Sequence, residues 1–270
     1  MKTKSRYLVK PGSRFRLQDW PTDDTGGFKG EDEVADELEQ HRRRLDALQD
    51  ILSAECCHAL LIVLQAMDTG GKDGTIRHIF TGVNPQGVNV TAFKTPTPEE
   101  AKHDYLWRIH AAVPRLGTIG IFNRSQYEDV LITRVHKLIT DKVAKRRFRE
   151  INDFEEMLFR NNVTILKFFL HISRKEQTAR LKARCDEKDK HYKISETDFR
   201  ERRYWDKYQE AYEDAIGATS RKHAPWFVIP ADHKWYRNLM ISQLIVEALE
   251  AMDLKYPKPT FDVSKICGKV

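Results

Sequence analysis

The sequence feature that most constrains the fold is an apolar run that leads into a glycine-rich loop. The run "ALLIVLQA" covers residues 59–66, and "MDTGGKDGT" follows at residues 67–75. An apolar run without polar alternation is typical of a strand that is buried on both faces, as in parallel sheets. Gly70 and Gly71 then allow a tight turn before a helix begins. The pattern predicts a strand–loop–helix unit whose loop presents backbone N–H groups to an anion.

Strand and helix patterns alternate along the rest of the chain. The predicted strands cover residues 59–66, 87–93, 118–122, 163–172 and 225–230. The predicted helices cover residues 31–54, 72–82, 97–113, 141–160, 174–185, 196–217 and 234–252. Because helices separate the strands, we expect consecutive strands to run parallel, with helices on both faces of the sheet. The sequence therefore predicts a three-layer α/β/α fold of the α/β class, with a central parallel five-stranded sheet.

The length of the chain and its turn residues indicate one main domain. A chain of 270 residues suits one large α/β domain. Residues 1–30 contain Pro11, Pro21 and adjacent glycines with weak periodicity, so we predict an irregular N-terminal arm there. Residues 31–270 show no internal repeat and no low-complexity linker, and we expect them to form a single domain.

The apolar runs and the cysteines allow a prediction of the cellular location. No run reaches the roughly 18 apolar residues of a membrane-spanning helix, so we expect no membrane association. The basic N-terminus has no continuous apolar segment, which argues against a secretory signal. The four cysteines have no C-x-x-C spacing, and we expect the adjacent Cys56 and Cys57 to be buried reduced thiols. These features predict a cytoplasmic protein.

Positive charge is concentrated in one segment of the chain. The net charge is +6, and residues 134–207 hold 21 Lys and Arg against 13 Asp and Glu. The rest of the chain is slightly acidic. A local positive field attracts polyanions, of which nucleic acid is one candidate. A solvated helical face would produce the same charge run.

The glycine-rich loop departs in two places from the phosphate-binding pattern G-x-x-x-x-G-K-[ST]. Ala66 replaces the first glycine, and Asp73 stands where a Ser or Thr would place its hydroxyl on magnesium. Lys72 supplies a mobile ammonium group for phosphate oxygens. Asp68 lies inside the loop, and its carboxylate can take over a hard cation from the missing hydroxyl. For Asp73, a favourable interaction with the helix dipole is the better explanation.

A second polar cluster follows the third predicted strand. The stretch "NRSQYED" contains Asn123, Arg124, Glu128 and Asp129. In open α/β sheets, ligands bind beyond the carboxyl ends of the strands, so we expect this cluster to face the loop. There Asp129 would reach toward Asp68, and Arg124 would stabilise a phosphoryl group during transfer. A helix cap for Ser125 and a surface ion pair between Arg124 and Glu128 are the structural alternatives.

Two predicted helices rich in arginine follow the fourth strand. Arg180 and Arg184 are four residues apart, so they share one face of the first helix. The second helix adds Arg200, Arg202 and Arg203. Such helices are typical of a lid that closes over anions and excludes water, and we place this lid at roughly residues 174–206. The spacing of Tyr204, Trp205, Tyr208 and Tyr212 favours packing over base stacking.

Six separated motifs together resemble the polyphosphate kinase 2 family. They read "LQAMDTGGKDGTIRHIF", "GVNPQGV", "DYLWRIHAAVP", "IFNRSQYEDVL", "KFFLHISRKEQTARLKAR" and "WDKYQEAYEDAI…APWFVIPADHKWYRN", and the resemblance runs from about residue 30 to about residue 253. The form "FNRSQYED" most resembles the class that phosphorylates both AMP and ADP. The resemblance implies a P-loop kinase-like fold with a helical lid. It also implies transfer of the terminal phosphate of inorganic polyphosphate to AMP or ADP, giving ADP or ATP, with Mg²⁺ or Mn²⁺ as the cofactor.

The motifs lead to a set of predicted site residues. Catalytic roles are predicted for Asp68, Lys72, Arg124 and Asp129, and the resemblance makes Asp68 and Asp129 metal ligands. Polyphosphate is expected to contact Thr69, Gly70, Gly71, Lys72, Asp73, Gly74, Thr75, Arg180 and Arg184. The nucleotide is expected to contact Arg77, Asn84, Asn123, Arg124 and Glu128. In the family, the position of Glu128 is tied to the choice of acceptor.

Two other functions stay open on the sequence alone. An ATP-dependent nucleoside or nucleotide kinase, similar to thymidylate kinases, would share the sheet and the lid, but the missing hydroxyl at residue 73 counts against it. A non-catalytic module could bind nucleic acid through the basic segment, but an RNA reader needs exposed aromatics on a sheet. We therefore expect polyphosphate, AMP, ADP and ATP as partners, no nucleic acid, and, as in the family, a homo-oligomer (dimer or tetramer).

Overall fold

The centre of the molecule is a five-stranded sheet in which all neighbouring strands pair in parallel. The fold is that of a computed structural model, which describes residues 6–261 and 263. The strands are β1 (Ala59–Ala66), β2 (Val88–Ala92), β3 (Ile119–Asn123), β4 (Val163–His171) and β5 (Trp226–Pro230), in the order β2-β3-β1-β4-β5. The predicted α/β class and parallel five-stranded sheet are confirmed.

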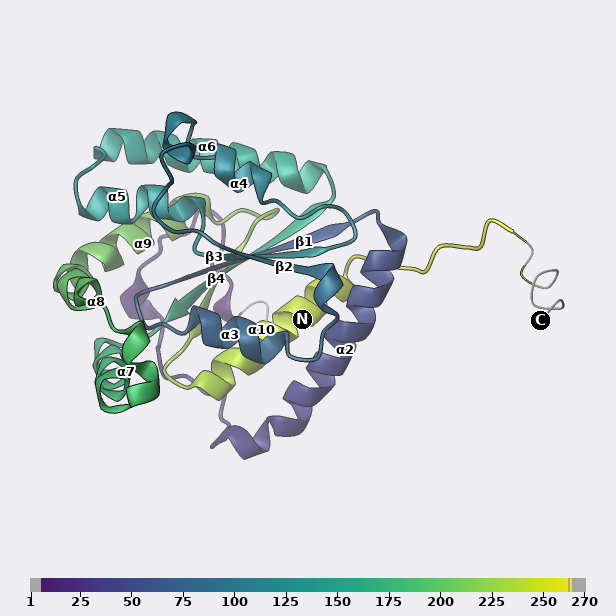
Figure 1. The fold of residues 1–270 in the computed structure, drawn as a ribbon, viewed down its shortest axis with the longest axis horizontal. Coiled ribbons are helices and arrows are strands. Elements are labelled where there is room, and N and C mark those ends of the chain that lie inside the picture. Colours follow the sequence, from purple (N-terminus) through teal and green to yellow (C-terminus); the bar gives the residue numbers. More distant parts are fainter. Residues whose placement is uncertain (1–5, 262, 264–270) are drawn as a thin grey trace.

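Helices cover both faces of this sheet and complete the three predicted layers (Figure 1). The α-helices are α2 (Ala35–Glu55), α3 (Lys72–Ile79), α4 (Trp107–Ala111), α5 (Ile132–Val135), α6 (Asp141–Arg160), α7 (Arg174–Asp186), α8 (Glu196–Glu201), α9 (Trp205–Thr219) and α10 (Lys234–Glu250). The 3₁₀ helices are η1 (Leu17–Asp19), η2 (Glu31–Glu33), η3 (Pro85–Gly87), η4 (Glu100–Lys102), η5 (Gln126–Val130), η6 (Lys188–Lys193) and η7 (Arg202–Tyr204). On one face α10 packs against α2 and α3, and on the other α6 packs against α9.

The central position of β1 in the sheet explains why its sequence is continuously apolar. All eight of its residues are buried, because β3 and β4 flank it and helices cover both of its faces. The edge strand β2 is partly exposed along its whole length, and its sequence contains Asn89 and Thr91. The polar edge residues and the apolar centre thus follow from each strand's place in the sheet.

One charged pair lies inside the core. Lys167 of β4 is completely buried, and its ammonium donates to Glu155 of α6 (2.5 Å), to the Tyr127 hydroxyl (2.9 Å) and to the Thr219 carbonyl (2.8 Å). Burial lowers the pKa of Lys167 to about 8, against the opposing effect of Glu155. The cluster ties β4, α6, α9 and the 3₁₀ helix η5 together, and η5 carries Glu128 and Asp129.

Two predicted helices are interrupted in the structure. Only η4 and the short α4 form within residues 97–113, because the Asp104 carboxylate accepts from the Leu106 N–H and turns the chain between them. Within residues 196–217, η7 separates α8 from α9. At this break Glu201 accepts from the Tyr208 hydroxyl and contacts the His136 ring, both at 2.8 Å, so side-chain contacts compete with a continuous helix.

The prediction of buried thiols at Cys56 and Cys57 is wrong. Both side chains are exposed, and both thiols are free. Cys56 ends α2 in the left-handed conformation with φ 54°, so the chain leaves the helix at the surface before β1 begins. Cys267 lies outside the described residues.

The N-terminal arm lies along the edge of the sheet. Leu8 forms an antiparallel bridge with Phe227 of β5, and the Val9 N–H donates to the Trp226 carbonyl at 2.9 Å. Tyr7 is buried, and its hydroxyl lies 2.7 Å from that of Tyr236 on α10. The arm therefore protects one edge of the sheet.

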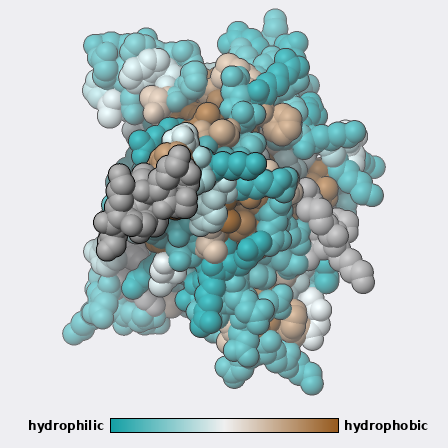
Figure 2. Space-filling view, turned by 90° about the vertical axis from the view of Figure 1, so that its right-hand side faces the viewer, coloured by the Kyte–Doolittle hydropathy of each residue, from teal (hydrophilic) through white to brown (hydrophobic). Residues whose placement is uncertain are grey.

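The surface opposite the carboxyl ends of the strands is mainly hydrophilic. Figure 2 shows this side, where apolar residues form small separated groups among hydrophilic ones. Single exposed apolar groups of this kind are normal for a protein surface. Among the described residues, no helix combines the length and the apolar character that a membrane span requires.

Candidate active site

The glycine-rich loop connects the carboxyl end of β1 with the first turn of α3. Its turn is closed by a hydrogen bond from the Gly70 N–H to the Met67 carbonyl (2.9 Å), and Gly71 has φ 98°. The first residue of α3 is Lys72, whose ammonium donates to the Ala66 carbonyl at 3.3 Å. Burial lowers the pKa of Lys72, and the nearby Arg124 lowers it further. The carboxylates of Asp68, Glu128 and Asp73 oppose this shift, and a phosphate would add further negative charge beside the ammonium.

Arg180 of α7 holds the backbone of the loop. Its Nη1 donates to the carbonyls of Thr69 and Gly70, both at 3.1 Å, and its Nη2 donates to the Ala231 carbonyl at 2.6 Å. Its Nε donates to the Glu176 carboxylate at 2.7 Å. The sequence predicted a phosphate contact for Arg180, and the guanidinium does line the groove described below. Its Nε, Nη1 and Nη2, however, already donate hydrogen bonds to oxygens of the protein itself.

Gly71 and Gly74 give opposite predictions for replacement by alanine. Gly71→Ala is expected to destabilise the protein by about 2 kcal/mol, because φ is positive there and the new Cβ would overlap the Arg237 guanidinium. Gly74→Ala in α3 meets no atom within 4 Å and is expected to stabilise the helix by about 0.5–1 kcal/mol. Urea unfolding of both variants measures the difference, and equal stabilities would contradict it.

The segment after β3 brings Arg124 and Glu128 to the loop. Arg124 has φ 64°, and its Nη2 lies 3.3 Å from Oδ1 of Asp68. Ser125 caps η5, and Gln65 of β1 can turn its amide to donate to Oε1 of Glu128 at 3.0 Å. Burial raises the pKa of Glu128, while Arg124 and Lys72 oppose that rise. The predicted approach of this segment to Asp68 thus occurs through Arg124 and Glu128.

Asp129 faces a different part of the molecule. Its carboxylate lies 4.0 Å from Arg108 and 3.9 Å from Arg147, and it lines a hollow that also includes Tyr105. Its Oδ2 is buried and has no hydrogen-bond partner in the described part of the chain. Burial raises the pKa of Asp129, and the two arginines oppose that rise. Asp68 and Glu128 thus line one cavity, whereas Asp129 lines another hollow.

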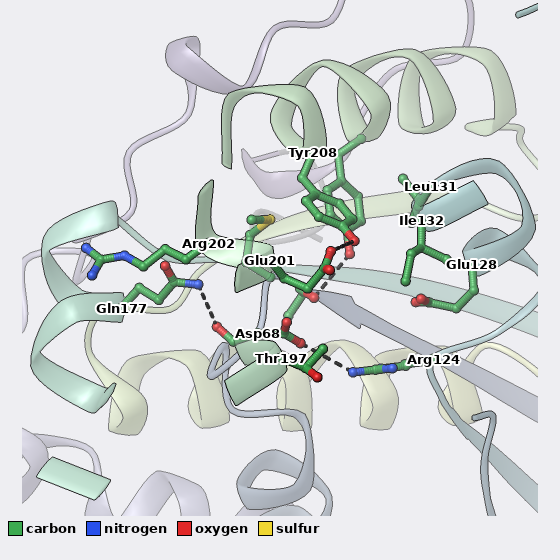
Figure 3. Close-up of a pocket in the computed structure, with 13 residues that line it drawn as sticks. Asp68, Arg124, Glu128, Leu131, Ile132, Gln177, Thr197, Glu201, Arg202 and Tyr208 are labelled. Atoms are coloured by element: carbon green, nitrogen blue, oxygen red, sulfur yellow. Dashed lines mark hydrogen bonds and ion pairs between the residues drawn. The ribbon is translucent and has the colours of Figure 1, made fainter. Parts of the chain in front are cut away.

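Two hollows meet at Asp68 and Arg124. A groove of about 890 Å³ follows the loop from Thr69 to Gly74 and includes Asn123, Arg180 and Arg184. A smaller cavity of about 110 Å³ lies between the start of the loop, η5 and α9, and contains Glu128. Figure 3 shows this cavity, with Asp68 and Arg124 joined by an ion pair at its lower side. Only Asp68 and Arg124, among the described lining residues, belong to both hollows.

The predicted lid region covers the small cavity. Thr197 and Glu201 of α8 and Arg202 of η7 line it from the side opposite η5 (Figure 3). At the base of this region, Gln177 of α7 donates to the Asp68 carbonyl at 3.1 Å. Arg202 also donates to the Thr178 hydroxyl, which joins η7 to α7. The lid segments therefore contact both the loop and one another.

Three predicted site residues serve local structure or lie away from both hollows. The Thr75 hydroxyl donates to the Gly71 carbonyl inside the first turn of α3. Asn84 caps η3 by accepting from the Gln86 N–H, and neither Asn84 nor Arg77 lines the groove or the cavity. Asn123 donates to Asp73, so these two predicted residues pair at the groove.

Several lining residues were missed by the sequence analysis. Lys94 follows β2, and Lys234 and Arg237 lie in the first turn of α10; all three line the groove. The rule that ligands bind beyond the carboxyl ends of the strands identified Arg124, and it would also have identified Lys94 and Lys234. The spacing of Tyr208 and Tyr212 of α9 favoured packing over base stacking, and both side chains line the cavity.

Comparison with known proteins shows which proteins this chain resembles. The family model described as "Polyphosphate kinase 2 (PPK2)" matches residues 29–257. A curated protein of Meiothermus ruber, named AMP/ADP-polyphosphate phosphotransferase, is 52% identical over 262 residues, covering 97% of this chain and 98% of its own. One of Rhodopseudomonas palustris, named ADP-polyphosphate phosphotransferase, is 41% identical, covering 96% and 94%.

A solved structure also agrees with the fold. The crystal structure of polyphosphate kinase 2 from Arthrobacter aurescens TC1 superimposes with a TM-score of 0.95 at 44% sequence identity. The match covers 99% of this chain and 95% of that chain. The groove, the cavity and the lid segments all lie within the matched part of the chain.

Proposed function

The chain belongs to the polyphosphate kinase 2 family, and we propose that it transfers the terminal phosphate of inorganic polyphosphate to AMP and ADP, giving ADP and ATP. Relatives with 52% and 41% identity over nearly the whole chain carry names for this chemistry. The family match and these names together support a transferase that acts on nucleotides.

The observation that carries the proposal is the meeting of two hollows at Asp68 and Arg124. A phosphoryl transfer between two polyanions needs a donor site and an acceptor site that share one point. The groove follows the loop N–H groups and Lys72, so it suits the donor chain. The cavity with Glu128 and the two tyrosines Tyr208 and Tyr212 suits the acceptor nucleotide.

The residues at the junction define the chemical step. A phosphate oxygen of the acceptor attacks the terminal phosphorus of polyphosphate, the bridging P–O bond breaks, and the shortened chain leaves with the bonding electrons. Lys72 and Arg124 contact the oxygens on which negative charge is spread, and their positions are set before the substrates arrive. The protein thus contributes positioning and charge stabilisation.

A divalent cation fits beside Asp68. Among the described residues, no group of three or more His, Cys, Asp or Glu side chains is placed to hold a metal. Mg²⁺ usually binds through one or two carboxylates plus substrate phosphates and water, so one loop carboxylate is sufficient. When bound, Mg²⁺ or Mn²⁺ would neutralise the charge of the two phosphate groups. We propose Asp68 as the main protein ligand. Asp129 is the second ligand that the family resemblance implies, but its carboxylate faces Arg108 and Arg147 here and would have to turn toward Asp68 to share the ion.

Replacing each acid separately tests this assignment. Asp68→Asn is expected to lower kcat about 100-fold and to raise the Mg²⁺ concentration needed for half-maximal rate. Asp129→Asn is expected to change the Mg²⁺ requirement less, because Arg108 and Arg147 already face its carboxylate. Titration of the rate with Mg²⁺ measures both effects. A normal Mg²⁺ requirement in Asp68→Asn would rule out its role as a ligand.

The lid segments have to move for the nucleotide to enter. Pockets for small molecules usually measure roughly 300–1,000 Å³, and the cavity of about 110 Å³ is smaller. Thr197, Glu201 and Arg202 line it from the lid side, so their displacement would enlarge it. Closure afterwards would exclude water and prevent hydrolysis of the donor.

A donor comparison tests the proposed function. The protein is incubated with Mg²⁺ and either AMP or ADP, with polyphosphate or ATP as the donor, and the nucleotide products are separated. Formation of ADP and ATP from polyphosphate is expected. Consumption of ATP but not of polyphosphate would favour the ATP-dependent kinase, and tight anion binding without product would favour the non-catalytic module. The cytoplasmic location and the homo-oligomeric state stay predictions.

A further inference from the structure

Arg237 of α10 is a buried guanidinium beside the loop. Its side chain is only 2% exposed, and its Nε and Nη2 both donate to the neutral Asn238 amide oxygen, at 3.1 and 2.8 Å. No carboxylate among the described residues pairs with it. Burial lowers the pKa of Arg237 to about 9, and the nearby Arg180 acts in the same direction. A buried cation without an anion is unfavourable unless a ligand supplies the negative charge.

The helix that carries Arg237 adds more positive charge at the same place. The first turn of α10 contains Lys234 and Arg237 and no acidic residue, and no side chain of residues 6–261 caps it. The N-terminus of a helix is itself partly positive, so cations there are unfavourable. Both side chains line the groove. Two cations at the start of a helix of 17 residues therefore line the same groove.

The sheet order fixes the side of the loop on which these cations lie. The loop follows the central strand β1, Arg124 follows β3 on one side, and α10 follows β5 on the other. Arg237 approaches the loop closely, because a Cβ on Gly71 would overlap its Nη1. The groove thus has Arg124 at the end shared with the acceptor cavity and Arg237 toward the opposite side.

We propose that Lys234 and Arg237 form a subsite for phosphates of the donor chain that are not themselves transferred. This inference rests on the proposed function, because it assumes that the donor occupies the groove. A terminal phosphate at Asp68 and Arg124 leaves the rest of the chain to continue over Gly71 toward α10. Only a chain that extends past Gly71 to α10 gains this contact, so the subsite would make the enzyme prefer long donors.

Donor length is the variable that tests the subsite. We compare kcat and KM for long-chain polyphosphate and for tripolyphosphate in Lys234→Ala, Arg237→Gln and Arg237→Lys. Loss of one charged contact is expected to raise KM for long chains about ten-fold, with kcat nearly unchanged. For tripolyphosphate the change is expected to stay below about two-fold. Arg237→Lys keeps the charge and should retain part of the preference for long chains.

The controls separate the subsite from general effects. Lys142→Ala removes an exposed lysine on α6, and it should leave both donors unaffected. Lys234 is exposed, so Lys234→Ala is expected to fold normally even if Arg237→Gln, at a buried position, does not. Equal KM increases for both donors, or none in Lys234→Ala, would overturn the inference.

A binding measurement distinguishes failure of the subsite from failure of the proposed function. End-labelled long polyphosphate is titrated with each variant in the absence of nucleotide, and fluorescence anisotropy reports binding. Weaker binding in Lys234→Ala but not in Lys142→Ala is expected, whether or not the protein transfers phosphate. If Lys234→Ala bound the chain as tightly as the parent protein while transfer remained intact, only the subsite would be rejected.

Discussion

Replacement of Lys72 by methionine is expected to lower kcat/KM for polyphosphate by about 1,000-fold. Methionine keeps an unbranched apolar stem but removes the ammonium group, which lies at the start of α3 beside Asp68 and Arg124. Burial around Lys72 strengthens its interaction with phosphate charge relative to the same pair in water. The loss should appear in kcat as well as in KM, because negative charge on the transferred group is spread over oxygens that Lys72 contacts.

Two controls accompany the Lys72 measurement. Lys72→Met should unfold in urea close to the parent midpoint, because the one hydrogen bond of its ammonium to another described residue is the weak one to the Ala66 carbonyl, at 3.3 Å. Lys142→Met applies the same chemical change at an exposed position on α6 and should keep full activity. A Lys72→Met protein within about ten-fold of the parent rate would remove this residue from the transfer step.

The second large effect concerns stability. Lys167→Met is expected to destabilise the protein by about 3–5 kcal/mol, because it leaves the Glu155 carboxylate buried without its cation. Lys167 and Glu155 have side-chain exposures of 0% and 1%, so solvent cannot replace the lost partner. The double variant Lys167→Met/Glu155→Leu should regain most of this loss, since it removes both charges.

Chemical unfolding of both single variants and the double variant measures the coupling between the two residues. A double variant that is no more stable than Lys167→Met would show that charge is not the cause. The activity of these variants also tests whether the buried pair affects the active site. Glu155 accepts hydrogen bonds from the side chains of Gln126 and Tyr127, which begin η5. Lower activity at temperatures where a variant is still folded would indicate that the buried pair positions Glu128.

Most of the correct predictions came from local patterns, in which the informative residues are close together in the sequence. The apolar run at residues 59–66 identified a fully buried strand, and the glycines after it identified the loop. The rule that ligands lie beyond strand ends placed Arg124 correctly beside Asp68. The order of the strands was not predicted, because strand pairing depends on contacts between distant parts of the chain.

The prediction that Asp129 reaches toward Asp68 shows what local sequence patterns could not determine. Glu128 and Asp129 are consecutive acids in η5, and only the phase of that 3₁₀ helix decides which of them faces the cavity. That phase depends on the Ser125 cap and on the Tyr127 contacts in the core. Arg237 could not be found in this way either, since its position beside Gly71 comes from the packing of α10 against α3.

The hydrogen bonds of α7 to the loop decide where the lid can bend. Arg180 joins the loop carbonyls to that of Ala231, and Gln177 holds the Asp68 carbonyl, so the first half of α7 is fastened to the sheet. If the proposed lid moves, we expect the moving part to begin beyond Arg180, with the connection at residues 187–195 between α7 and α8 as the hinge. Movement of α8 and η7 relative to the first half of α7 would then control substrate access. The glycine-rich loop would keep its conformation while these segments open and close.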